Sequence, residues 1–229
     1  HKAFGCNNYQ LIPLTKGQFS LFMEEKDFAG INVTIPYKEA VFPYCDKISE
    51  KAKAIGAINT IKAVATANGI RLLGDNTDFD GFLYLLEKHH ISLTNKVVMI
   101  LGTGGTCKTV TAVAKHLNAK KIITVSRKAA NGFIDYQQCQ KEKTVQIIIN
   151  TSPVGMYPQV GNCNIDLSLY PQLEAIVDVI FNPAETKFLQ QGKSLGPPSV
   201  NGLEMLVAQA KFAEEIFFDR KIDNQEIDK

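Results

Sequence analysis

The chain has 229 residues, of which 45% are hydrophobic and 21% charged, and its formal net charge at pH 7 is +2. This length can bury a substantial core and is long enough for two lobes. The small net charge gives no reason to expect nucleic acid or a membrane surface as a partner. Five cysteines without a C-x-x-C pair favour reduced thiols in a cytoplasmic protein, and no apolar run reaches membrane-spanning length.

The N-terminal part predicts one strand and one helix. Because the sequence begins with His1 rather than methionine, we expect the natural N-terminus to lie upstream. Residues 9–14 are mostly apolar and predict a strand that ends at Pro13. The helical spacing of three apolar side chains then indicates a helix with one buried face; these are Phe19, Phe22 and Met23.

Residues 30–38 predict a short strand followed by a helix. Gly30 opens the strand, and Pro36 suits the first position of a helix, where its missing N–H is harmless. Lys38 would then lie in the first helical turn, where a cation opposes the helix dipole. A broken local rule of this kind points to function, and a solvated surface lysine is the alternative.

The next stretch predicts a helix, a hairpin and a second helix. Residues 49–54 predict a helix, and residues 56–61 predict the strand that follows it. Asn68-Gly69 is a two-residue hairpin signal between two apolar runs. Asp78 then comes just before a helical pattern, where it either caps the helix or presents a carboxylate at a loop-to-helix corner.

A strand, a glycine turn and a helix follow at residues 96–117. Val97–Leu101 is an apolar run of the length of a buried strand, and Val110, Val113 and Leu117 share one helical face. Such a turn lets the backbone approach a pyrophosphate whose charge is bound by the helix N-terminus. The third glycine position of the usual motif holds Cys107, and glycine turns are common in other contexts too. The predicted phosphate-binding residues are Gly102, Thr103, Gly104, Gly105 and Thr106.

The second strand of this region, residues 121–125, predicts the cofactor. NAD-binding domains usually place an acid near its end to bind the ribose 2′-hydroxyl. This chain has Ser126, Arg127 and Lys128 there instead, and two adjacent cations suit a 2′-phosphate. The sequence therefore predicts NADP.

The remainder predicts two more strands and a final helix. Residues 146–149 and 175–180 read as buried strands, the second as the last of its sheet, and Asn201-Gly202 opens the helix. The stretch 127–144 is short for a helix, a strand and their loops, so either residues are missing or the domain is trimmed.

Six ordered blocks resemble the shikimate dehydrogenase family: GINVTIPYK, AIGAINT, GDNTDFDG, LGTGG, NTSPVGM and NGLEMLVAQA. The resemblance runs from about residue 9 to residue 213. It implies an α/β fold with an N-terminal α/β substrate domain and a Rossmann-type NADP-binding domain, the C-terminal helix returning to the first domain. The expected boundaries are residues 1–78 with 203–229, and residues 79–202.

The resemblance also implies roles for single residues. Lys38 and Asp78 would be the catalytic pair, and the substrate would contact Thr34, Asn59 and Gln209. The remaining expected cofactor contacts are Thr151 and Gly202, on the nicotinamide side, and Met205. Gln209 shares a helical stripe with apolar residues, so its amide needs a partner, and an ordinary buried amide is the alternative.

Three departures from the family pattern stand out. Phe181 replaces the tyrosine of a Tyr-x-Pro block and therefore lacks its hydroxyl, and Ser126 replaces an asparagine. The family's Ser-x-Ser-Pro turn, whose hydroxyls hold the substrate carboxylate, is not within this sequence.

The resemblance implies an NADPH-dependent enzyme that reduces 3-dehydroshikimate reversibly to shikimate. We expect a small-molecule substrate, no metal, and a monomer or homodimer. One alternative is a quinate/shikimate dehydrogenase that uses NAD or NADP, although NAD would favour an acid after the second strand. Another is a non-catalytic NADP-binding module of the same fold. A Tyr-x-x-x-Lys pair, Tyr84 and Lys88, precedes the glycine turn and is interpreted as a helix face.

Overall fold

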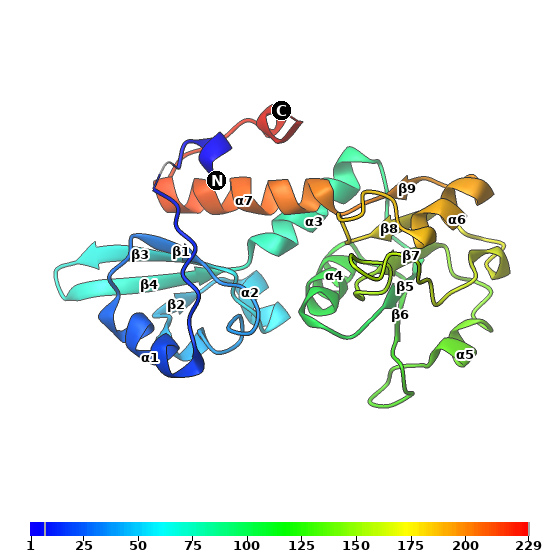
Figure 1. Cartoon of the computed structure of the whole chain (residues 1–229), viewed down its shortest axis with the longest axis horizontal. Coiled ribbons are helices and arrows are strands. Elements are labelled where there is room, and N and C mark those ends of the chain that lie inside the picture. Colours follow the sequence, from blue (N-terminus) through cyan, green and yellow to red (C-terminus); the bar gives the residue numbers. More distant parts are fainter. Residues whose placement is uncertain (7, 229) are drawn as a thin grey trace. The chain divides into compact units, whose positions relative to one another are not determined.

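The computed structural model describes residues 1–6 and 8–228. The chain divides into two compact units (Figure 1). The first comprises His1–Gly81 and Val207–Lys229, and the second comprises Phe82–Leu206. Helices α3 (Thr77–Lys88) and α7 (Leu203–Phe218) each begin in one unit and end in the other.

The first unit is built on a four-stranded sheet with the order β1-β3-β4-β2. Its strands are β1 (Gly30–Asn32), β2 (Lys47–Ile48), β3 (Thr60–Thr66) and β4 (Gly69–Asp75). The predicted hairpin is confirmed, because β3 and β4 pair antiparallel, but its two-residue turn is Ala67-Asn68 rather than Asn68-Gly69, since Gly69 already pairs with Thr66. Strand β2 is parallel to β4, and β1 is antiparallel to β3.

Short helices complete the first unit together with part of α7. They are α1 (Lys16–Glu25), α2 (Glu50–Ile55) and the 3₁₀ turns η1 (Lys2–Phe4), η2 (Phe42–Tyr44) and η4 (Asn224–Asp228). The predicted buried face of α1 is confirmed for Phe19 and Met23. These two side chains join one apolar core with Val33, Val41, Ala52, Ile58, Ile61 and Leu72.

Two predictions for this unit are wrong. Residues 9–14 form no strand, and Leu11 and Ile12 are 88% and 55% exposed, so this apolar stretch has neither a strand partner nor a buried face. No helix begins at Pro36 either. The Tyr37 N–H donates to the Thr34 carbonyl at 2.9 Å, which closes a turn, and residues 38–41 continue as turns.

The second unit is a five-stranded parallel sheet with the order β6-β5-β7-β8-β9. The strands are β5 (Val97–Leu101), β6 (Lys121–Val125), β7 (Ile147–Asn150), β8 (Ala175–Asp178) and β9 (Ser199–Val200). The prediction that residues 175–180 form the last strand is therefore wrong. Strand β9 has only two residues and no hydrophobic period, so only its pairing with β8 reveals it.

Apolar residues on both faces of β5 explain its burial. All five of its residues are buried, and alternate side chains point to opposite faces. Val97, Met99 and Leu101 share a core with residues of α5 (Tyr136–Cys139) and α6 (Lys187–Leu195). Helix α4 (Gly105–His116) contacts β5 and presents buried residues such as Val110 and Val113.

Two connections of this unit differ from a regular α/β repeat. Between β6 and β7 the chain makes isolated bridges at Val125–Ile134 and Ala130–Phe133, and α5 has four residues. Helix α6 was not predicted, although its N-cap Thr186 and the glycine at its C-terminal cap, Gly196 (φ 99°), are ordinary helix boundary signals.

Candidate active site

Lys38 and Asp78 form an ion pair in the first unit. The Lys38 ammonium donates to Asp78 Oδ2 at 2.7 Å, and the two side chains are 27% and 19% exposed. Asp78 lies in the first turn of α3, but Asn76 caps this helix, since its Oδ1 accepts from the Phe79 N–H at 3.3 Å. The capping alternative for Asp78 is therefore wrong, and its carboxylate faces a cation.

The short segment Ala57–Asn59 holds both members of the pair. The Ile58 N–H donates to the Lys38 carbonyl at 2.8 Å, which ties the turn that carries the lysine. On the other side, the Thr77 N–H donates to Asn59 Oδ1 at 2.7 Å, and Asn76 Nδ2 donates to the Ala57 carbonyl at 2.8 Å. The segments that carry Lys38 and Asp78, 40 residues apart in the chain, are therefore both hydrogen-bonded to residues 57–59.

Asn59 is a buried side chain with a fixed orientation. Its exposure is 3%, and its Oδ1 accepts from the Thr77 N–H, the Thr77 hydroxyl (3.2 Å) and the Thr60 hydroxyl (2.9 Å). Because the amide is planar, this arrangement directs its NH2 group to the opposite side. The geometry leaves a donor for an external acceptor such as a hydroxyl oxygen.

The other two predicted substrate residues lie in the same unit. Thr34 is exposed, at the turn that leads to Lys38, and Gln209 is half-buried on α7. The structure brings Lys38 and Asp78 together and links Asn59 to them through Thr77.

Sequence reasoning missed several polar residues of this site. Asp75, the last residue of β4, accepts from the Ser49 hydroxyl at 2.6 Å and from the Asn76 N–H at 2.7 Å. Lys51 pairs with both Asp75 and Asp80. The available signal was the density of carboxylates in GDNTDFDG, which requires cations nearby once the segment is half-buried.

The glycine turn has the form of an anion site. Helix α4 begins without a side-chain cap and without an acid in its first turn, and Thr103, Gly104 and Gly105 are exposed. Added Cβ atoms at Gly104 and Gly105 would meet nothing within 4 Å, so the backbone there faces open space. Gly102 has φ 102°, which favours glycine.

Cys107, at the third motif position, is a packing residue. It is 5% exposed, and burial raises the pKa of its thiol, although hydrogen bonds with Thr111, Thr151 and Thr124 act in the opposite direction. A neutral, small side chain suits the place that glycine or alanine occupies in this motif.

The residues predicted for the 2′-phosphate lie at the same sheet edge as the glycine turn. Strands β5 and β6 pair in register up to Leu101 and Val125, and the Gly102 N–H donates to the Val125 carbonyl at 2.9 Å. Arg127 and Lys128 follow directly and are exposed, while Ser126 is half-buried. Two cations thus stand one strand away from the helix N-terminus.

The other residues predicted to contact the cofactor lie elsewhere in this unit. Thr151 donates through its N–H and its hydroxyl to the Leu101 carbonyl, both at 2.8 Å. At Gly202 an added Cβ would lie 2.1 Å from the Val179 carbonyl oxygen, so only glycine fits. Met205 is 8% exposed, and Phe181 is 47% exposed.

A buried carboxylate organises the ends of β7 and β8. Asp178 is fully buried and accepts from the Thr186 hydroxyl (2.6 Å), Asn150 Nδ2 (3.0 Å) and the Ile180 N–H (3.1 Å). Burial raises the pKa of Asp178 to about 6, against the effect of these three donors. Since Thr186 caps α6, the carboxylate connects two strand ends to a helix start.

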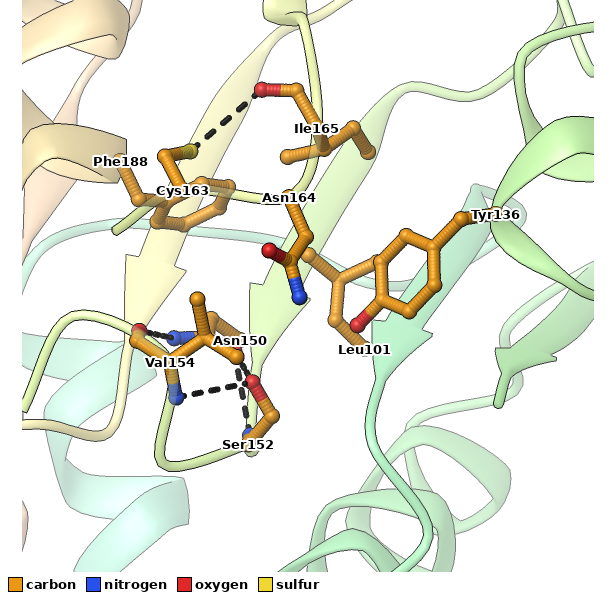
Figure 2. A pocket seen from close by; sticks show the side chains of 9 residues that line it. All are labelled: Leu101, Tyr136, Asn150, Ser152, Val154, Cys163, Asn164, Ile165 and Phe188. Carbon is orange, nitrogen blue, oxygen red and sulfur yellow. Dashed lines mark hydrogen bonds between the residues drawn. The ribbon is translucent and has the colours of Figure 1, made fainter. Parts of the chain in front are cut away.

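A small pocket lies next to this network (Figure 2). Figure 2 shows how Asn150, Ser152 and Val154 are joined: the Ser152 hydroxyl donates to Asn150 Oδ1 at 2.7 Å and accepts from the Val154 N–H at 3.3 Å. The pocket has an empty volume of about 210 Å³, which includes open solvent. The residues that line it include neither the glycine turn nor Arg127 and Lys128, so it does not coincide with the predicted dinucleotide site.

The part of the chain that the structure describes shows neither a membrane-spanning helix nor a metal-binding cluster. No helix there is long and apolar enough to cross a membrane. No group of three or more His, Cys, Asp or Glu side chains within residues 1–6 and 8–228 could hold a metal ion.

Comparisons with known proteins agree on one family. Residues 7–61 match the model of the shikimate dehydrogenase substrate binding domain. A shikimate dehydrogenase (NADP(+)) from Clostridium beijerinckii is 37% identical over 231 residues, which is 92% of this chain and 84% of the relative.

Solved structures give the same result. The chorismate mutase/shikimate 5-dehydrogenase fusion protein from Clostridium acetobutylicum is 38% identical with a TM-score of 0.83, covering 93% of this chain and 79% of that chain. Shikimate 5-dehydrogenase from Thermus thermophilus in complex with NADP(H) and shikimate is 26% identical with a TM-score of 0.78, covering 94% and 83%. Sequence identity over nearly the whole chain, the two units and the site geometry together show that this chain belongs to the shikimate dehydrogenase family.

Proposed function

We propose that this chain catalyses the reversible, NADPH-dependent reduction of 3-dehydroshikimate to shikimate. The observation that carries the proposal is the Lys38–Asp78 ion pair at 2.7 Å, half-buried and held on the segment that presents the Asn59 amide. The family and the NADP(+)-dependent names of its members support the substrate and the cofactor.

The reaction requires a hydride on the ketone carbon and a proton on the ketone oxygen, and bound NADPH supplies the hydride. Lys38 is the proposed proton donor. Its ammonium has three N–H groups, of which one is held by Asp78, so the others can reach a substrate oxygen. As negative charge develops on that oxygen, the ammonium stabilises it and transfers its proton. In the reverse direction, neutral Lys38 takes the proton from the alcohol.

Asp78 and Asn59 orient the reaction partners. The Asp78 carboxylate holds the lysine and has a second oxygen that can accept from a ring hydroxyl. The Asn59 NH2 group can donate to another hydroxyl oxygen, since its own oxygen is occupied within the protein. Thr34 and Gln209 are proposed as further hydroxyl partners.

The residues at the sheet edge of the second unit fit NADP. The uncapped start of α4 would bind the pyrophosphate through the N–H groups of Gly104, Gly105 and Thr106. Arg127 and Lys128 would bind the 2′-phosphate, with Ser126 beside them. Their positive charges disfavour a cofactor preference for NAD. Gly102, Thr103, Thr151, Gly202 and Met205 are proposed as the remaining cofactor contacts.

A cytoplasmic location is proposed on the basis of the five free cysteines. The chain is proposed to act as a monomer or a homodimer, which light scattering distinguishes.

The test is the absorbance of reduced nicotinamide after mixing the protein with each substrate and each cofactor. Shikimate with NADP is expected to give the highest kcat/KM of the four combinations with quinate and NAD. No turnover with shikimate would overturn the proposal. Equal turnover of quinate with NAD would assign the chain to the quinate/shikimate alternative, and NADP binding without turnover would indicate a binding module.

A further inference from the structure

An ion triad lies beside the proposed catalytic pair and is not part of it. Lys51, on α2, forms ion pairs with Asp75 Oδ1 at 3.3 Å and with Asp80 Oδ2. The three side chains are 22–27% exposed, so each is largely removed from water. A half-buried ion pair of this kind is shielded less by salt than a surface pair.

The two carboxylates of the triad flank Asp78 along the chain. Asp75 ends β4, three residues before Asp78, and Asp80 follows it by two residues on α3. One ammonium on α2 therefore binds both ends of the six-residue segment that carries the proposed catalytic carboxylate. The Ser49 hydroxyl reinforces this link, because it accepts from the Ala52 N–H as the cap of α2 and donates to Asp75.

The negative charges of this segment also require the contacts that Lys51 makes. Asp75, Asp78 and Asp80 place three carboxylates within six residues, and Lys38 pairs with the middle one. Without Lys51, two largely buried negative charges would face each other across the start of α3. Such a segment would move toward solvent, and an isolated buried charge is costly.

We propose that Lys51 is a positioning residue, which fixes the first turn of α3 through Asp75 and Asp80 and thereby holds Asp78 in line with Lys38. The inference rests on the proposed function, because the position of Asp78 matters only if Asp78 takes part in the reaction. Small displacements of a catalytic group are costly, about 100-fold in rate for about 1 Å.

The test compares Lys51→Met and Lys51→Arg with the wild type. Methionine keeps the aliphatic stem and removes the charge, so kcat is expected to fall about 10- to 100-fold, while NADPH affinity stays within about twofold. Arginine can still bridge the two carboxylates, and kcat should recover to within about threefold of the wild type. Lys53→Met is the matched control, since Lys53 lies on the same helix and pairs with Glu50 at the surface.

A double variant and an exchange measurement make the test independent of stability. Lys51→Met combined with Asp80→Asn removes both charged partners of one ion pair. The kcat of this double variant should therefore be no lower than that of Lys51→Met alone. Hydrogen exchange of the peptide that covers residues 76–82 should be faster in Lys51→Met and unchanged in Lys53→Met.

The outcomes separate the two proposals. If the wild type does not turn over shikimate, the proposed function fails, and the exchange measurement still decides whether Lys51 holds α3. If the wild type is active, the inference is overturned when Lys51→Met keeps kcat within about twofold. It is equally overturned if Lys53→Met loses as much activity, or if Lys51→Arg restores nothing.

Discussion

At the scale of single residues, the environment of Lys38 decides the chemistry. The lysine lies in a turn, not a helix, and its backbone carbonyl accepts from the Ile58 N–H at 2.8 Å. Its ammonium therefore has a fixed partner in Asp78 rather than an opposing helix dipole. Asn59 follows Ile58 in the same backbone segment. The Lys38 ammonium, the Asp78 carboxylate and the Asn59 amide therefore form one arrangement.

Replacement of Lys38 should remove proton transfer and little else. For Lys38→Met we expect kcat to fall about 10²–10⁴-fold, because methionine matches the length but carries no proton. NADPH affinity should stay within about twofold, since the proposed cofactor residues belong to the other unit. Steady-state kinetics and a fluorescence titration with NADPH measure both quantities, and Lys16→Met, an exposed lysine of the first unit, is the control. A near-normal kcat with a raised KM would show that Lys38 only binds substrate.

Replacement of Arg127 should change the choice of cofactor. Arg127→Ala removes a charged donor for the 2′-phosphate, and NADPH binding should weaken by about 1.5–3 kcal/mol, the usual contribution of a charged hydrogen bond. NADH lacks this phosphate and should lose much less affinity. Calorimetric titration with both cofactors gives the comparison, and equal losses would place the 2′-phosphate elsewhere.

At the scale of secondary-structure elements, glycines have two different roles in the second unit. Before α7, the backbone at Gly202 passes so close to Val179 that no side chain fits, and the Gly202 N–H donates to the Ile180 carbonyl at 3.0 Å. Before α4, Gly104 and Gly105 face open space. At Gly202 packing requires the absence of a side chain, whereas at Gly104 and Gly105 this absence leaves the backbone accessible to a ligand.

A pair of alanine variants separates these roles. Gly202→Ala must displace the start of α7, and we expect a loss of about 1–3 kcal/mol in the free energy of unfolding, as for other overpacked sites. At roughly 2–4 °C per kcal/mol, the Tm falls by several degrees. Gly105→Ala should keep the Tm and weaken NADPH binding. Thermal melts with and without NADPH test both, and a Tm loss for Gly105→Ala alone would contradict the assignment.

At the scale of the whole molecule, each unit has its own core and its own set of polar residues. The first unit contains the proposed catalytic and substrate residues, and the second contains the proposed cofactor residues. In the second unit, the buried Asp178 links β7, β8 and α6. Its titration should therefore be visible in the pH dependence of stability.

The pH dependence of Asp178 has a definite sign. Burial raises its pKa from 3.8 to about 6, so between these values the folded state holds a proton that the unfolded state has released. The free energy of unfolding should therefore decrease as pH rises through this window, by up to about 3 kcal/mol from this group. Above about pH 6 both states are ionised and the contribution no longer changes.

Comparison with Asp178→Asn isolates the effect, with urea unfolding measured across the acidic range. The stability difference between wild type and variant should decrease with rising pH up to about 6 and then stay level. Glu174→Gln is a control of opposite sign, because the hydrogen bond from Lys96 lowers the pKa of Glu174 and its stabilisation is lost as pH falls. A pH-independent difference for Asp178→Asn would show that burial does not raise this pKa.

The sequence by itself determined the elements whose signals are local. Five consecutive apolar residues, a glycine turn and a helical stripe predicted β5, the turn and α4, because strand burial and phosphate binding both depend on neighbours in the chain. The hairpin signalled by Asn68-Gly69 was predictable for the same reason, although strand pairing places its two-residue turn one position earlier. The ordered blocks, which include Lys38 and Asp78, indicated the family.

Only the tertiary structure decided what those residues contact. Lys38 lies in a turn because its backbone carbonyl accepts a hydrogen bond from the N–H of Ile58, twenty residues later in the chain. The two-residue strand β9 is a strand only through its pairing with β8, and residues 9–14 form no strand because none pairs with them. Lys51 belongs to the site because two carboxylates from another segment converge on it. Hydrogen bonds and ion pairs between distant segments leave no periodic trace in the sequence, since each depends on the packing of the whole unit.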